Sequence, residues 1–368
     1  MKRIIDNLKS LYKYFTYRIF LIFYGKIKGK ILARQDKRIK ILPVTKEKKI
    51  NYHIYEVSQG RLYTDRVHDT AILLDNFIVD GPSQQLRPID NAPVEENIVF
   101  EKGTPRIKKK INGTVLSLLT GGAGNDNYSH WLYDVLPRIA LCENVINLSK
   151  IDYYLAPSLK NNYQKETLEL LGINKNQLIS SENYRHFESS KLIVSDHPYC
   201  ISGSATKDIM NIPQWIPRWL REKLLITKKN EMKFPKKFYI DRSDSKSNTR
   251  HLRKIINENE VKDLLKKNGF EFIQLGKLNF KDQTKIFNNA DIIVGLHGAG
   301  FANLCFCEQK TKIIELRGLS SGTQYKNLAD KNKLEYQAIS CEPIKHDAKN
   351  QYGHINVPIE ALEKLVKI

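Results

Sequence analysis

Apolar residues recur along most of the chain in two alternating patterns, one typical of strands and one typical of helices. Short runs rich in Leu, Ile, Val and Tyr, bounded by Gly, Pro, Asp or Ser, predict strands in the first half at residues 70–81, 114–122, 151–158 and 190–196. Helical spacing lies between them, at 130–146 and 162–173, and Gly172 stands where the second helix would stop. Alternating strands and helices predict a parallel α/β layer.

The same alternation restarts more clearly in the second half. Strands are predicted at 237–243, 271–275, 291–296 and 311–318, and helices at 257–270, 279–290 and 298–306. Asn257 and Glu260 have the spacing of a capping box, and Gly269 follows the end of that helix. The pattern predicts a doubly wound nucleotide-binding unit. We expect the final helix, at 357–368, to pack back across the first domain.

Length and linker composition predict two domains. A chain of 368 residues exceeds the size at which a single hydrophobic core stops growing. Residues 212–237 predict a helix and then a charged, proline-marked linker, which places the boundary near 225–236. The expected fold class is α/β, with two Rossmann-like domains facing a central cleft. The expected segments are 1–40, 41–230, 231–345 and 346–368.

The N-terminal segment combines aromatic residues with basic ones. Across residues 11–38, Lys13 and Arg18 interrupt the apolar positions, and a stretch rich in Lys and Arg follows. This pattern is typical of a segment lying on an anionic membrane surface, and the formal net charge of +20 is compatible with that partner. An ordinary packed N-terminal helix is the alternative. The unbroken apolar region and small-residue cleavage site of a secretory signal are missing.

Cysteine usage and charge distribution narrow the class of protein. The five cysteines are scattered and form no CxxC pair, which indicates reduced thiols in a cytoplasmic protein. Lys residues are spread along most of the chain, and no helix-turn-helix, RRM or zinc-finger signature is present. We therefore expect no nucleic acid among the partners, with a basic nucleic-acid-binding protein kept as an alternative class.

The stretch ADIIVGLHGAGFANLCF, residues 290–306, places a small-residue turn between an apolar strand and an apolar helix. Gly298 and Gly300 allow close backbone approach, and the helix start supplies N–H donors and a partial positive charge, which suits a diphosphate. His297 could donate a hydrogen bond to a phosphate or sugar oxygen. Asn303 stands where a dinucleotide fingerprint needs a third glycine. Glycine that serves only to pack a tight turn is the alternative.

Two further features lie at predicted strand ends. Arg242, Arg250 and Arg253 fall in and after a loop, where guanidinium groups can bind phosphate in a bidentate manner. A solvated basic loop is the alternative. Glu315 ends the next strand at the same sheet edge as His297. Its carboxylate could accept hydrogen bonds from ribose hydroxyls, or it could be an ordinary surface glutamate.

The densest polar cluster of the first half lies in GGAGNDNYSHWLYDVLPRI, residues 121–139. His130 and Asp134 are four residues apart, so a helix carries them on one face, which Arg138 extends. Asp134 would fix the tautomer of the imidazole and raise its basicity, making His130 a general base. A histidine that only caps or packs is the alternative. No D-x-D spacing occurs, so we expect no metal and no other cofactor.

Taken in order, these clusters resemble glycosyltransferase family 61, the family with the DUF563 domain, which includes many bacterial capsule or lipopolysaccharide proteins. The resemblance spans about residues 60–320. It rests on NYSHWLYDVLPR at 127–138, YIDR at 239–242 with RKIINENEV at 253–261, and DIIVGLHGAGFANLCF with IIEL within 291–316. It implies a GT-B fold, inverting chemistry without a metal, and a nucleotide-sugar donor held mainly by the C-terminal lobe.

The resemblance also implies roles on the donor side. Arg242 and Arg253 would bind the diphosphate, and Glu315 would touch the nucleoside. The loop at 243–252 looks longer than the family pattern, so Arg250 remains an alternative to Arg253. The residues implied for the donor pocket are His297, Gly298, Ala299, Gly300 and Asn303.

On the acceptor side, His130 and Asp134 match the family's His-x-x-x-Asp, with Asn127 and Arg138 beside them. Either His130 acts alone, or Asp134 is the base with His130 beside it. The expected partners are a nucleotide-sugar donor and a glycan or lipid-linked acceptor. The Lys-rich composition and basic N-terminus predict a bacterial enzyme of capsule or lipopolysaccharide synthesis, cytoplasmic or peripheral on the inner face of the membrane.

A serine hydrolase is the competing interpretation. GLSSG at 318–322 matches the nucleophile elbow, with Ser320 as nucleophile, and Asp330 and His346 or His354 follow in triad order. Only about 20 residues separate this motif from the His-Gly-Ala-Gly turn, which is too few for the strands and helices that lie between them in a hydrolase sheet.

Overall fold

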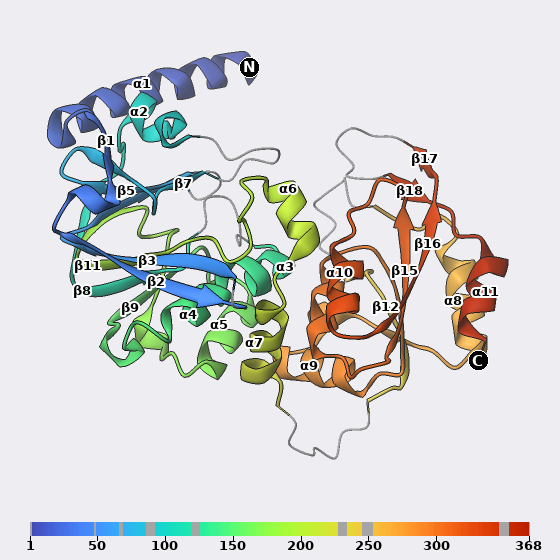
Figure 1. Ribbon diagram of the computed structural model, residues 1–368. Helices are drawn as coiled ribbons and strands as arrows, with labels where there is room; N and C mark the ends of the chain where they lie inside the picture. Colours follow the sequence, from blue (N-terminus) through green and yellow to red (C-terminus); the bar gives the residue numbers. More distant parts are fainter. Residues whose placement is uncertain are drawn as a thin grey trace. The chain divides into compact units, whose positions relative to one another are not determined.

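The computed structural model describes residues 2–367 apart from 48, 66–68, 86–92, 120–125, 227–233, 245–252 and 346–352. The chain divides into two compact units, Met1–Ile209 and Met210–Ile368 (Figure 1). This division lies upstream of the boundary at 225–236 that the linker composition predicts.

Helix α7, Trp215–Leu224, explains the earlier boundary, because it packs within the second unit. The guanidinium of Arg221 donates through Nη1 to the carbonyls of Phe306 (2.6 Å) and Cys307 (2.7 Å). The apolar face of α7 buries Ile216, Leu220 and Leu224 almost completely. The sequence pattern finds this helix but assigns it to the wrong side of the division.

A mixed sheet forms the scaffold of the first unit. Its strands are β1 (Gly29–Leu32), β2 (Ile39–Lys46), β3 (Ile50–Ser58), β4 (Arg61–Thr64), β5 (Asp69–Leu74), β6 (Phe77–Asp80), β7 (Gln84–Gln85), β8 (Lys109–Ser117), β9 (Tyr153–Ala156), β10 (Leu178–Ser180) and β11 (His186–Ser195). The main path runs β1-β6-β5-β4-β11-β8-β9-β10, while β2 pairs with β3, β3 also with β11, and β7 with β5.

Only part of this sheet is parallel. Strands β11, β8, β9 and β10 are parallel neighbours, whereas β2, β3, β4, β5 and β7 join through antiparallel pairs. The run predicted at 70–81 is a hairpin of β5 and β6, which turns at Asp75 with φ of 53°. The Rossmann-like prediction for 41–230 is therefore correct for the parallel strands and wrong for the rest, because short hairpins reverse the chain.

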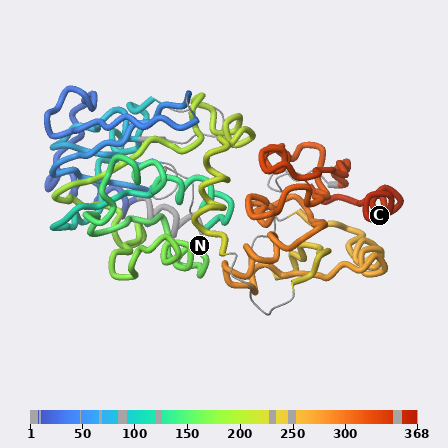
Figure 2. Tube along the Cα trace, turned by 60° about the horizontal axis from the view of Figure 1, so that its bottom comes forward, coloured from blue at the N-terminus to red at the C-terminus, as the bar shows by residue number. Residues whose placement is uncertain are grey.

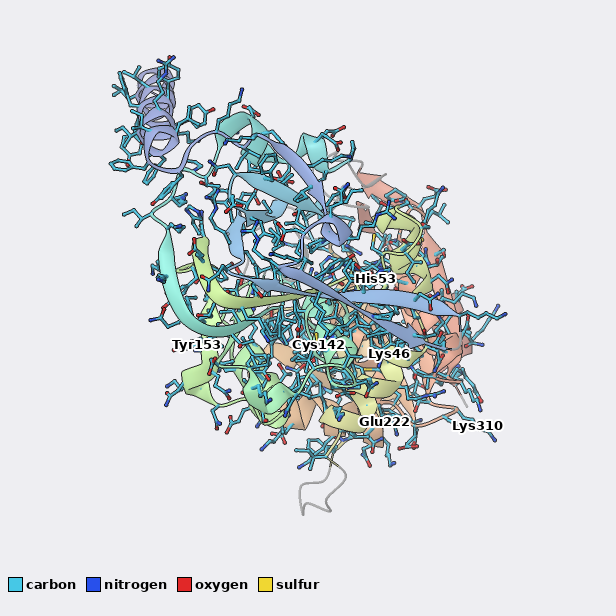
Figure 3. The ribbon with its side chains drawn as sticks, turned by 60° about the vertical axis from the view of Figure 1, so that its left-hand side comes forward. Lys46, His53, Cys142, Tyr153, Glu222 and Lys310 are labelled. Atoms are coloured by element: carbon cyan, nitrogen blue, oxygen red, sulfur yellow. The ribbon has the colours of Figure 1, made fainter. Side chains whose placement is uncertain are left out.

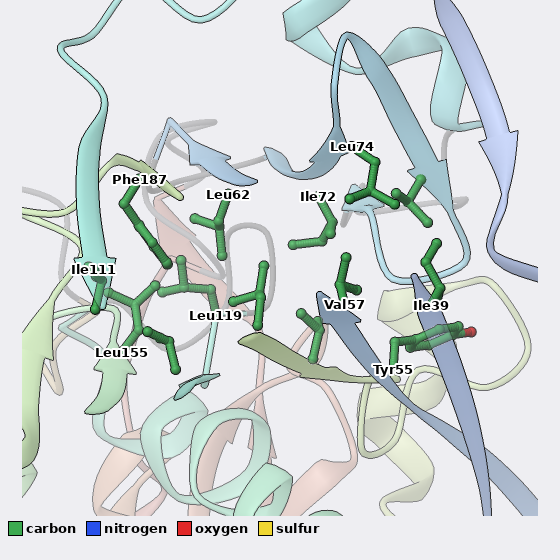
Figure 4. Close-up of a cluster of buried hydrophobic side chains, with 14 of the residues drawn as sticks. Ile39, Tyr55, Val57, Leu62, Ile72, Leu74, Ile111, Leu119, Leu155 and Phe187 are labelled. Carbon is green, nitrogen blue, oxygen red and sulfur yellow. The ribbon is translucent and has the colours of Figure 1, made fainter. Parts of the chain in front are cut away.

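One apolar cluster of the first unit, shown in Figure 4, lies on one face of this sheet, and a second cluster includes Tyr63, Ala71 and Leu73. Val57, Leu62, Ile72, Val115 and Phe187 contribute side chains that are wholly buried. Alternate side chains of a strand point to opposite faces of the sheet. These five residues lie on β3, β4, β5, β8 and β11, and their side chains meet in a single cluster. Burial at this level makes the sheet the rigid support for the loops at its edges.

Helices surround the sheet, and one predicted helix is broken. They are α1 (Lys2–Tyr24), α2 (Ile98–Lys102), α3 (Tyr128–His130), α4 (Pro137–Cys142), α5 (Asn162–Leu170) and α6 (Ala205–Asp208), with 3-10 turns at Ala33–Gln35, Val94–Glu96, Leu148–Lys150 and Lys175–Gln177. The helix predicted at 130–146 contains a π-helical turn, Trp131–Val135, between α3 and α4. In it, the N–H of Leu136 donates to the carbonyl of Trp131 (3.1 Å), five residues back.

Side-chain contacts tie α4 and α1 to the sheet. Lys46, at the end of β2, donates to the carbonyl of Ala140 in α4 (3.1 Å), and both Lys46 and the neighbouring Cys142 are labelled in Figure 3. The hydroxyl of Tyr24, at the end of α1, accepts from the N–H of Lys108 (2.9 Å). Among the helices of the described residues, none combines the length and apolarity needed to cross a bilayer.

The second unit contains a parallel five-stranded sheet in the order β13-β12-β14-β15-β16. Its strands are β12 (Lys237–Ile240), β13 (Glu271–Ile273), β14 (Ile292–Leu296), β15 (Lys312–Gly318) and β16 (Glu335–Cys341), and β17 (Pro343–Lys345) pairs with β18 (His354–Ile355) nearby. The chain reverses its direction of growth between β12 and β14, so this pair is the switch point of a doubly wound sheet. The doubly wound prediction for this half is confirmed.

Helices cover both faces of this second sheet (Figure 1). The helices are α8 (Glu258–Lys267), α9 (Phe280–Asn289), α10 (Gln324–Lys331) and α11 (Ile359–Val366), with 3-10 helices Ile209–Asn211, Leu275–Lys277 and Ala299–Phe306. The segment predicted as an ordinary helix at 298–306 is thus a 3-10 helix of eight residues. Its packing against α9 and α10 buries every residue from Phe301 to Phe306.

The C-terminal helix packs on its own unit, which corrects the expectation that it crosses to the first domain. Leu362 and Val366 of α11 are buried with Val261 and Leu265 of α8, and Figure 2 shows the two helices side by side. The predicted capping box is also absent from the contacts of α8. Asn257 instead exchanges two 2.9 Å hydrogen bonds with the backbone of residue 357, which fastens the C-terminal segment.

Candidate active site

Polar side chains gather at two sheet edges, one in each unit. In the first unit they are His130, Asp134, Arg138 and His197, which we call the His130 site. In the second they are Arg242, Arg253, His297, Glu315 and Arg317, which we call the His297 site. Both sites lie where parallel strands present their carboxyl ends, which is where ligands bind in such sheets.

The start of α3 positions His130. Asn127 caps this short helix, because its side-chain oxygen accepts from the N–H groups of Ser129 (2.9 Å) and His130 (3.2 Å). The sequence prediction placed Asn127 on the acceptor side, and the structure gives its side-chain oxygen a capping contact. A cap of this kind fixes the first turn and with it the direction of the imidazole.

The pair that the i, i+4 spacing predicts is present. His130 Nδ1 lies 2.9 Å from Asp134 Oδ2, with the His130 side chain 36% exposed and the Asp134 side chain 1% exposed. The π-helical turn contains Asp134, and such widened turns occur often at functional sites. A carboxylate can only accept, so Nδ1 carries the proton and Nε2 of the neutral ring is left as the basic nitrogen.

Two opposing effects set the pKa of His130. Burial lowers it, while the negative charge of Asp134 and the hydrogen bond to it raise it, and the net pKa is raised above the ordinary 6.5. The ring is thus a stronger base than a free histidine, and a third of its surface faces solvent. These are the properties of a general base that accepts a proton from a bound hydroxyl.

His197 joins this site although the sequence analysis did not select it. It follows β11, the parallel neighbour of β8, and its Nε2 lies 3.9 Å from Asp134 Oδ2. Its Nδ1 accepts from the N–H groups of Tyr199 (3.3 Å) and Cys200 (3.0 Å), so the proton is on Nε2 and faces Asp134. Burial lowers the pKa of His197 to about 3, which keeps the ring neutral. The feature of the sequence that could have identified His197 is its position directly after the strand predicted at 190–196.

Arg138 lies beneath the pair and is not exposed toward an acceptor. It is 1% exposed, and its Nη1 donates to the carbonyl (2.8 Å) and hydroxyl (3.2 Å) of Ser195 at the end of β11. Burial lowers the pKa of Arg138 to about 10, and the nearby charge of Asp134 opposes that shift. The predicted acceptor-side contact is therefore replaced by a bracing contact between α4 and β11.

The His297 site forms at the switch point of the second sheet. Arg242 lies just after β12 and His297 directly after β14. Nη1 of Arg242 (3.4 Å) and Nη1 of Arg253 (3.1 Å) both donate to the carbonyl of His297. The structure thus brings together the two arginines that the family resemblance selects, while Arg250 lies outside the described residues.

The glycines of the HGAG turn permit this close approach. A Cβ at position 298 would lie 3.3 Å from Arg242 Nη1, and a Cβ at position 300 would lie 3.0 Å from a Leu275 methyl carbon. Ala299 begins the 3-10 helix that follows. Asn303 is wholly buried, and its amide donates to the side-chain oxygen of Gln283 (3.3 Å), so it contacts the interior of the unit and not an open donor pocket.

His297 and Glu315 form a second histidine–carboxylate pair. His297 Nδ1 bonds to one oxygen of Glu315, and the hydroxyl of Tyr336 donates to the other. Glu315 is 0% exposed, so it orients His297 and has no surface toward a nucleoside. The side-chain amide of Gln324 lies 3.2 Å from His297 Nε2 and donates to it.

The pKa of His297 is lowered, in contrast to that of His130. Burial lowers it most, Glu315 opposes the shift, and the charges of Arg253 and Arg317 lower it further. Arg317 is 8% exposed on β15, two residues after Glu315, and its Nη2 donates to the carbonyl of Ser321. The sequence analysis missed this third cation, although the alternation along β15 places it on the same face as Glu315.

The structure does not assemble the hydrolase triad. Ser320 is exposed in the turn after β15, Asp330 pairs with Lys326 (2.6 Å), and His354 accepts from the N–H of Lys254 (3.1 Å). No hydrogen bond joins Ser320 to Asp330 or His354 in the described part of the chain, and His346 lies outside it. Within the same residues, no three His, Cys, Asp or Glu side chains come together as a metal site.

The second unit thus carries arginines at the switch point of a doubly wound sheet, and the first carries a carboxylate-backed imidazole. The family model of Glycosyltransferase 61 matches residues 128–314, more than half of the 368-residue chain. The chain belongs to glycosyltransferase family 61. The family predicted from the three motifs is confirmed.

Curated relatives support the same family over a shorter region. EGF domain-specific O-linked N-acetylglucosamine transferases from Bos taurus (34% identical over 89 residues), Rattus norvegicus (35% over 89) and Drosophila melanogaster (32% over 88) are similar to this chain. The matched region covers 23% of this chain and 17% of the relatives' length. The chain thus matches less than a fifth of each relative.

Proposed function

We propose that this protein is a glycosyltransferase with a GT-B fold, which works with inversion and without a metal. It moves a hexosyl or pentosyl unit from a nucleotide-sugar donor to a hydroxyl of a glycan or glycolipid acceptor. The observation that carries the proposal is the presence of a partly exposed, carboxylate-backed His130 in one unit and of Arg242 and Arg253 on the carbonyl of His297 in the other. We assign the donor to the His297 site and the acceptor to the His130 site, acting in one reaction.

Three arginines and a close backbone support donor binding at the His297 site. Arg242 and Arg253 converge on the carbonyl of His297, and Arg317 lies close enough to lower the pKa of its ring. Guanidinium groups bind phosphate oxygens with charge-assisted hydrogen bonds and stabilise the negative charge of a departing nucleoside diphosphate. This supports a diphosphate near the HGAG turn.

The protonation of His297 suggests which part of the donor it touches. Its Nδ1 proton is committed to Glu315, so Nε2 of the neutral ring is an acceptor, as its contact with Gln324 indicates. An acceptor nitrogen suits a hydroxyl of the ribose or the sugar and not a phosphate oxygen. We therefore assign His297 a hydroxyl contact, in which a donor hydroxyl replaces the Gln324 amide at Nε2, and Glu315 the role of positioning residue.

The His130 site would supply the base. His130 Nε2 removes the proton of the acceptor hydroxyl as its oxygen attacks the anomeric carbon from the side opposite the diphosphate. The bond from that carbon to the diphosphate oxygen breaks, and its electron pair leaves with the nucleoside diphosphate. The proton ends on His130, where Asp134 stabilises the imidazolium. Asp134 is 1% exposed and already bonded, which favours His130 as the base.

Donor binding and product stereochemistry test this proposal. Calorimetry against UDP-, GDP-, CMP- and TDP-sugars should give one donor class that binds, and NMR of the product should show an inverted anomeric centre. Transfer should persist in excess EDTA. Retention of configuration, or loss of transfer in EDTA with recovery on adding Mn²⁺, would overturn the corresponding part of the proposal.

We further propose that the enzyme is cytoplasmic and works at the inner face of a bacterial membrane, on acceptors of capsule or lipopolysaccharide synthesis. Helix α1 supports a membrane contact, because one of its faces is apolar and exposed. That face comprises Leu8 (60% exposed), Leu11 (54%), Tyr12 (73%), Phe15 (57%), Ile19 (51%), Ile22 (83%) and Phe23 (74%). Their spacing of three and four residues places them along one side of the helix.

The opposite face of α1 packs on the first unit, through Tyr17 and Leu21 near Gly103 and through Tyr24. This leaves the exposed stripe for another partner, and Arg18 beside it favours an anionic surface. An apolar face of this width suits a helix that lies in the interfacial plane of a bilayer. The alternative from the sequence, a packed N-terminal helix, therefore accounts for the packed face of α1 and not for its exposed face.

Vesicle binding tests the membrane proposal independently of transfer. The protein should sediment with vesicles of phosphatidylglycerol and phosphatidylcholine, and Ile22→Glu with Phe23→Glu should reduce the bound fraction at least about 10-fold because charges would enter the apolar layer. Ile344→Glu, at a position 57% exposed in the second unit, is the matched control. Equal binding of both variants would refute the assignment to α1.

A further inference from the structure

A polar cavity of about 410 Å³ lies in the first unit, apart from the His130 site. Its lining residues are Arg38, Gln59, Arg61, Asp75, Asn76, Lys108 and Glu188. Lys108 immediately precedes β8 and Glu188 is near the start of β11, so the cavity lies toward the amino ends of these strands. His130 and His197 follow their carboxyl ends. Strands β8 and β11 are nine and ten residues long. At a rise of about 3.3 Å per residue, the cavity and the His130 site are roughly 30 Å apart.

Arg61 is the unusual member of this cavity. It is 6% exposed, and its Nε and Nη2 have no hydrogen-bond acceptor among the residues that the structure describes. Burial lowers the pKa of Arg61, with the nearby charge of Glu188 opposing the shift, but a guanidinium remains protonated in proteins. A buried cation whose donors lack acceptors is costly, so a missing partner is expected at these two nitrogens.

The carboxylates of the cavity are already engaged by other cations. Glu188 accepts from Lys108 Nζ (2.6 Å), and Asp75 accepts from Arg38 Nη2 (2.9 Å). Arg38 also pairs with Asp36 beside the cavity (2.7 Å), so Arg38 and Lys108 are both held by carboxylates, whereas Arg61 carries unpaired donors. The partner that fits these donors is an oxyanion, because Nε and Nη2 present two parallel N–H bonds to two oxygens.

The remaining lining residues indicate what carries the oxyanion. Gln59 and Asn76 have amides that can donate to and accept from hydroxyl groups, and the cavity volume falls in the range of small-molecule sites, not of a lone inorganic ion. We propose that this cavity binds an anionic saccharide unit, with its carboxylate or phosphate on Arg61 and its hydroxyls on Gln59 and Asn76. The saccharide class rests on the proposed function, while the oxyanion does not.

Calorimetry on the full chain carrying His130→Ala, with no donor present, tests the cavity separately from catalysis. Glucuronate and glucose 6-phosphate should bind saturably, and glucose should bind at least about 10-fold more weakly because it lacks the anion. Arg61→Gln should remove anion binding. Because Arg61 is buried, Asn76→Ala at the rim gives a second readout and should weaken binding several-fold while the fold is kept. Lys191→Ala, an exposed cation on β11, should change nothing.

Each other outcome overturns part of the proposal. Equal binding of glucose and glucuronate, or unchanged binding in both Arg61→Gln and Asn76→Ala, refutes the site. Inorganic phosphate that binds as tightly as glucose 6-phosphate refutes the saccharide class, because the hydroxyl contacts then contribute nothing. Phosphatidylglycerol vesicles that require Arg61 when no soluble sugar binds would assign the cavity to a lipid headgroup instead. Absence of transfer by the wild-type chain with intact anion binding would refute the proposed function alone.

Discussion

The two units each contain a histidine held through Nδ1 by a buried carboxylate, yet the pKa values of the two rings are shifted in opposite directions. The His130 side chain is 36% exposed and its pKa is raised, whereas the His297 side chain is 3% exposed and its pKa is lowered. Burial lowers the pKa of both rings, but the charge of Asp134 and its hydrogen bond outweigh burial at His130, whereas Arg253 and Arg317 lower the pKa of His297 further. The same two functional groups thus become a base in one setting and a neutral hydrogen-bonding ring in the other.

Replacing each histidine separates these two roles, and His130 should show the largest effect. His130→Ala should lower kcat about 10³-fold, in the range of lost general-base catalysis, and leave donor affinity nearly unchanged. His297→Ala should mainly raise the KM for the donor. Initial rates and donor calorimetry on both variants measure the contrast.

A matched control for this pair of variants is His53→Ala. His53 also pairs with an aspartate, Asp196 (3.1 Å), but its side chain is 48% exposed on the first unit (Figure 3). It should retain full transfer. If His130→Ala kept full turnover on the true substrates, the assignment of the base would be wrong.

Removing the carboxylates tests the pKa difference directly. Asp134→Asn removes the charge that raises the pKa of His130, so the acid limb of kcat/KM should move to lower pH, and kcat should fall about 10²-fold as the tautomer is lost. Glu315→Gln should leave the acid limb in place and change only donor KM. An acid limb that moves in the second variant and not in the first would reverse the roles of the two histidines.

The arginines of the His297 site should contribute to binding of the donor. Arg253→Ala should weaken nucleoside diphosphate binding about 10- to 100-fold, the effect of one or two charge-assisted hydrogen bonds, and Arg253→Lys should restore part of it. Lys236→Ala, a surface cation of the same unit paired with Asp291, is the control. Unchanged affinity in Arg253→Ala would move the phosphate role to Arg250.

The smallest expected effect is on stability. Because the pKa of His130 is raised in the folded state, its pairing stabilises the protein below pH 6.5, and this contribution disappears as pH rises through the raised pKa. The stability lost in His130→Ala should therefore be larger at pH 5.5 than at pH 8.5. For a ring this exposed the difference should stay below about 1 kcal/mol, measured by urea unfolding. A larger loss at the higher pH would contradict the raised pKa.

The sequence predicted the contacts that local spacing determines. His130 with Asp134 follows from helical periodicity, and His297 beside Arg242 follows from two predicted parallel strands that end together. It did not predict His197, because that contact depends on β11 pairing with β8 across intervening helices. It also did not predict the burial of Glu315, because periodicity along β15 identifies a face but not that Tyr336 and His297 would cover the carboxylate.

The longer-range errors have a similar cause. The pattern at 357–368 shows an apolar helix but not which unit it covers, and Asn257, read as a cap, binds residue 357 instead. Hairpins such as β5–β6 were read as one apolar run, which hid the antiparallel strands. In each case the competing interaction came from a segment far away in the chain.

Helices α7 and α11 both pack on the second unit. Their packing decides which fragment of the protein can be studied on its own. A fragment that begins at residue 210 keeps both helices, and with them the hydrogen bonds of Arg221 to the backbone of Phe306 and Cys307. A fragment cut at 231, where the composition of the chain suggests a linker, would strip α7 away and expose the residues it covers. Titration of the longer fragment with nucleotides by NMR would then report on the donor half of the reaction alone.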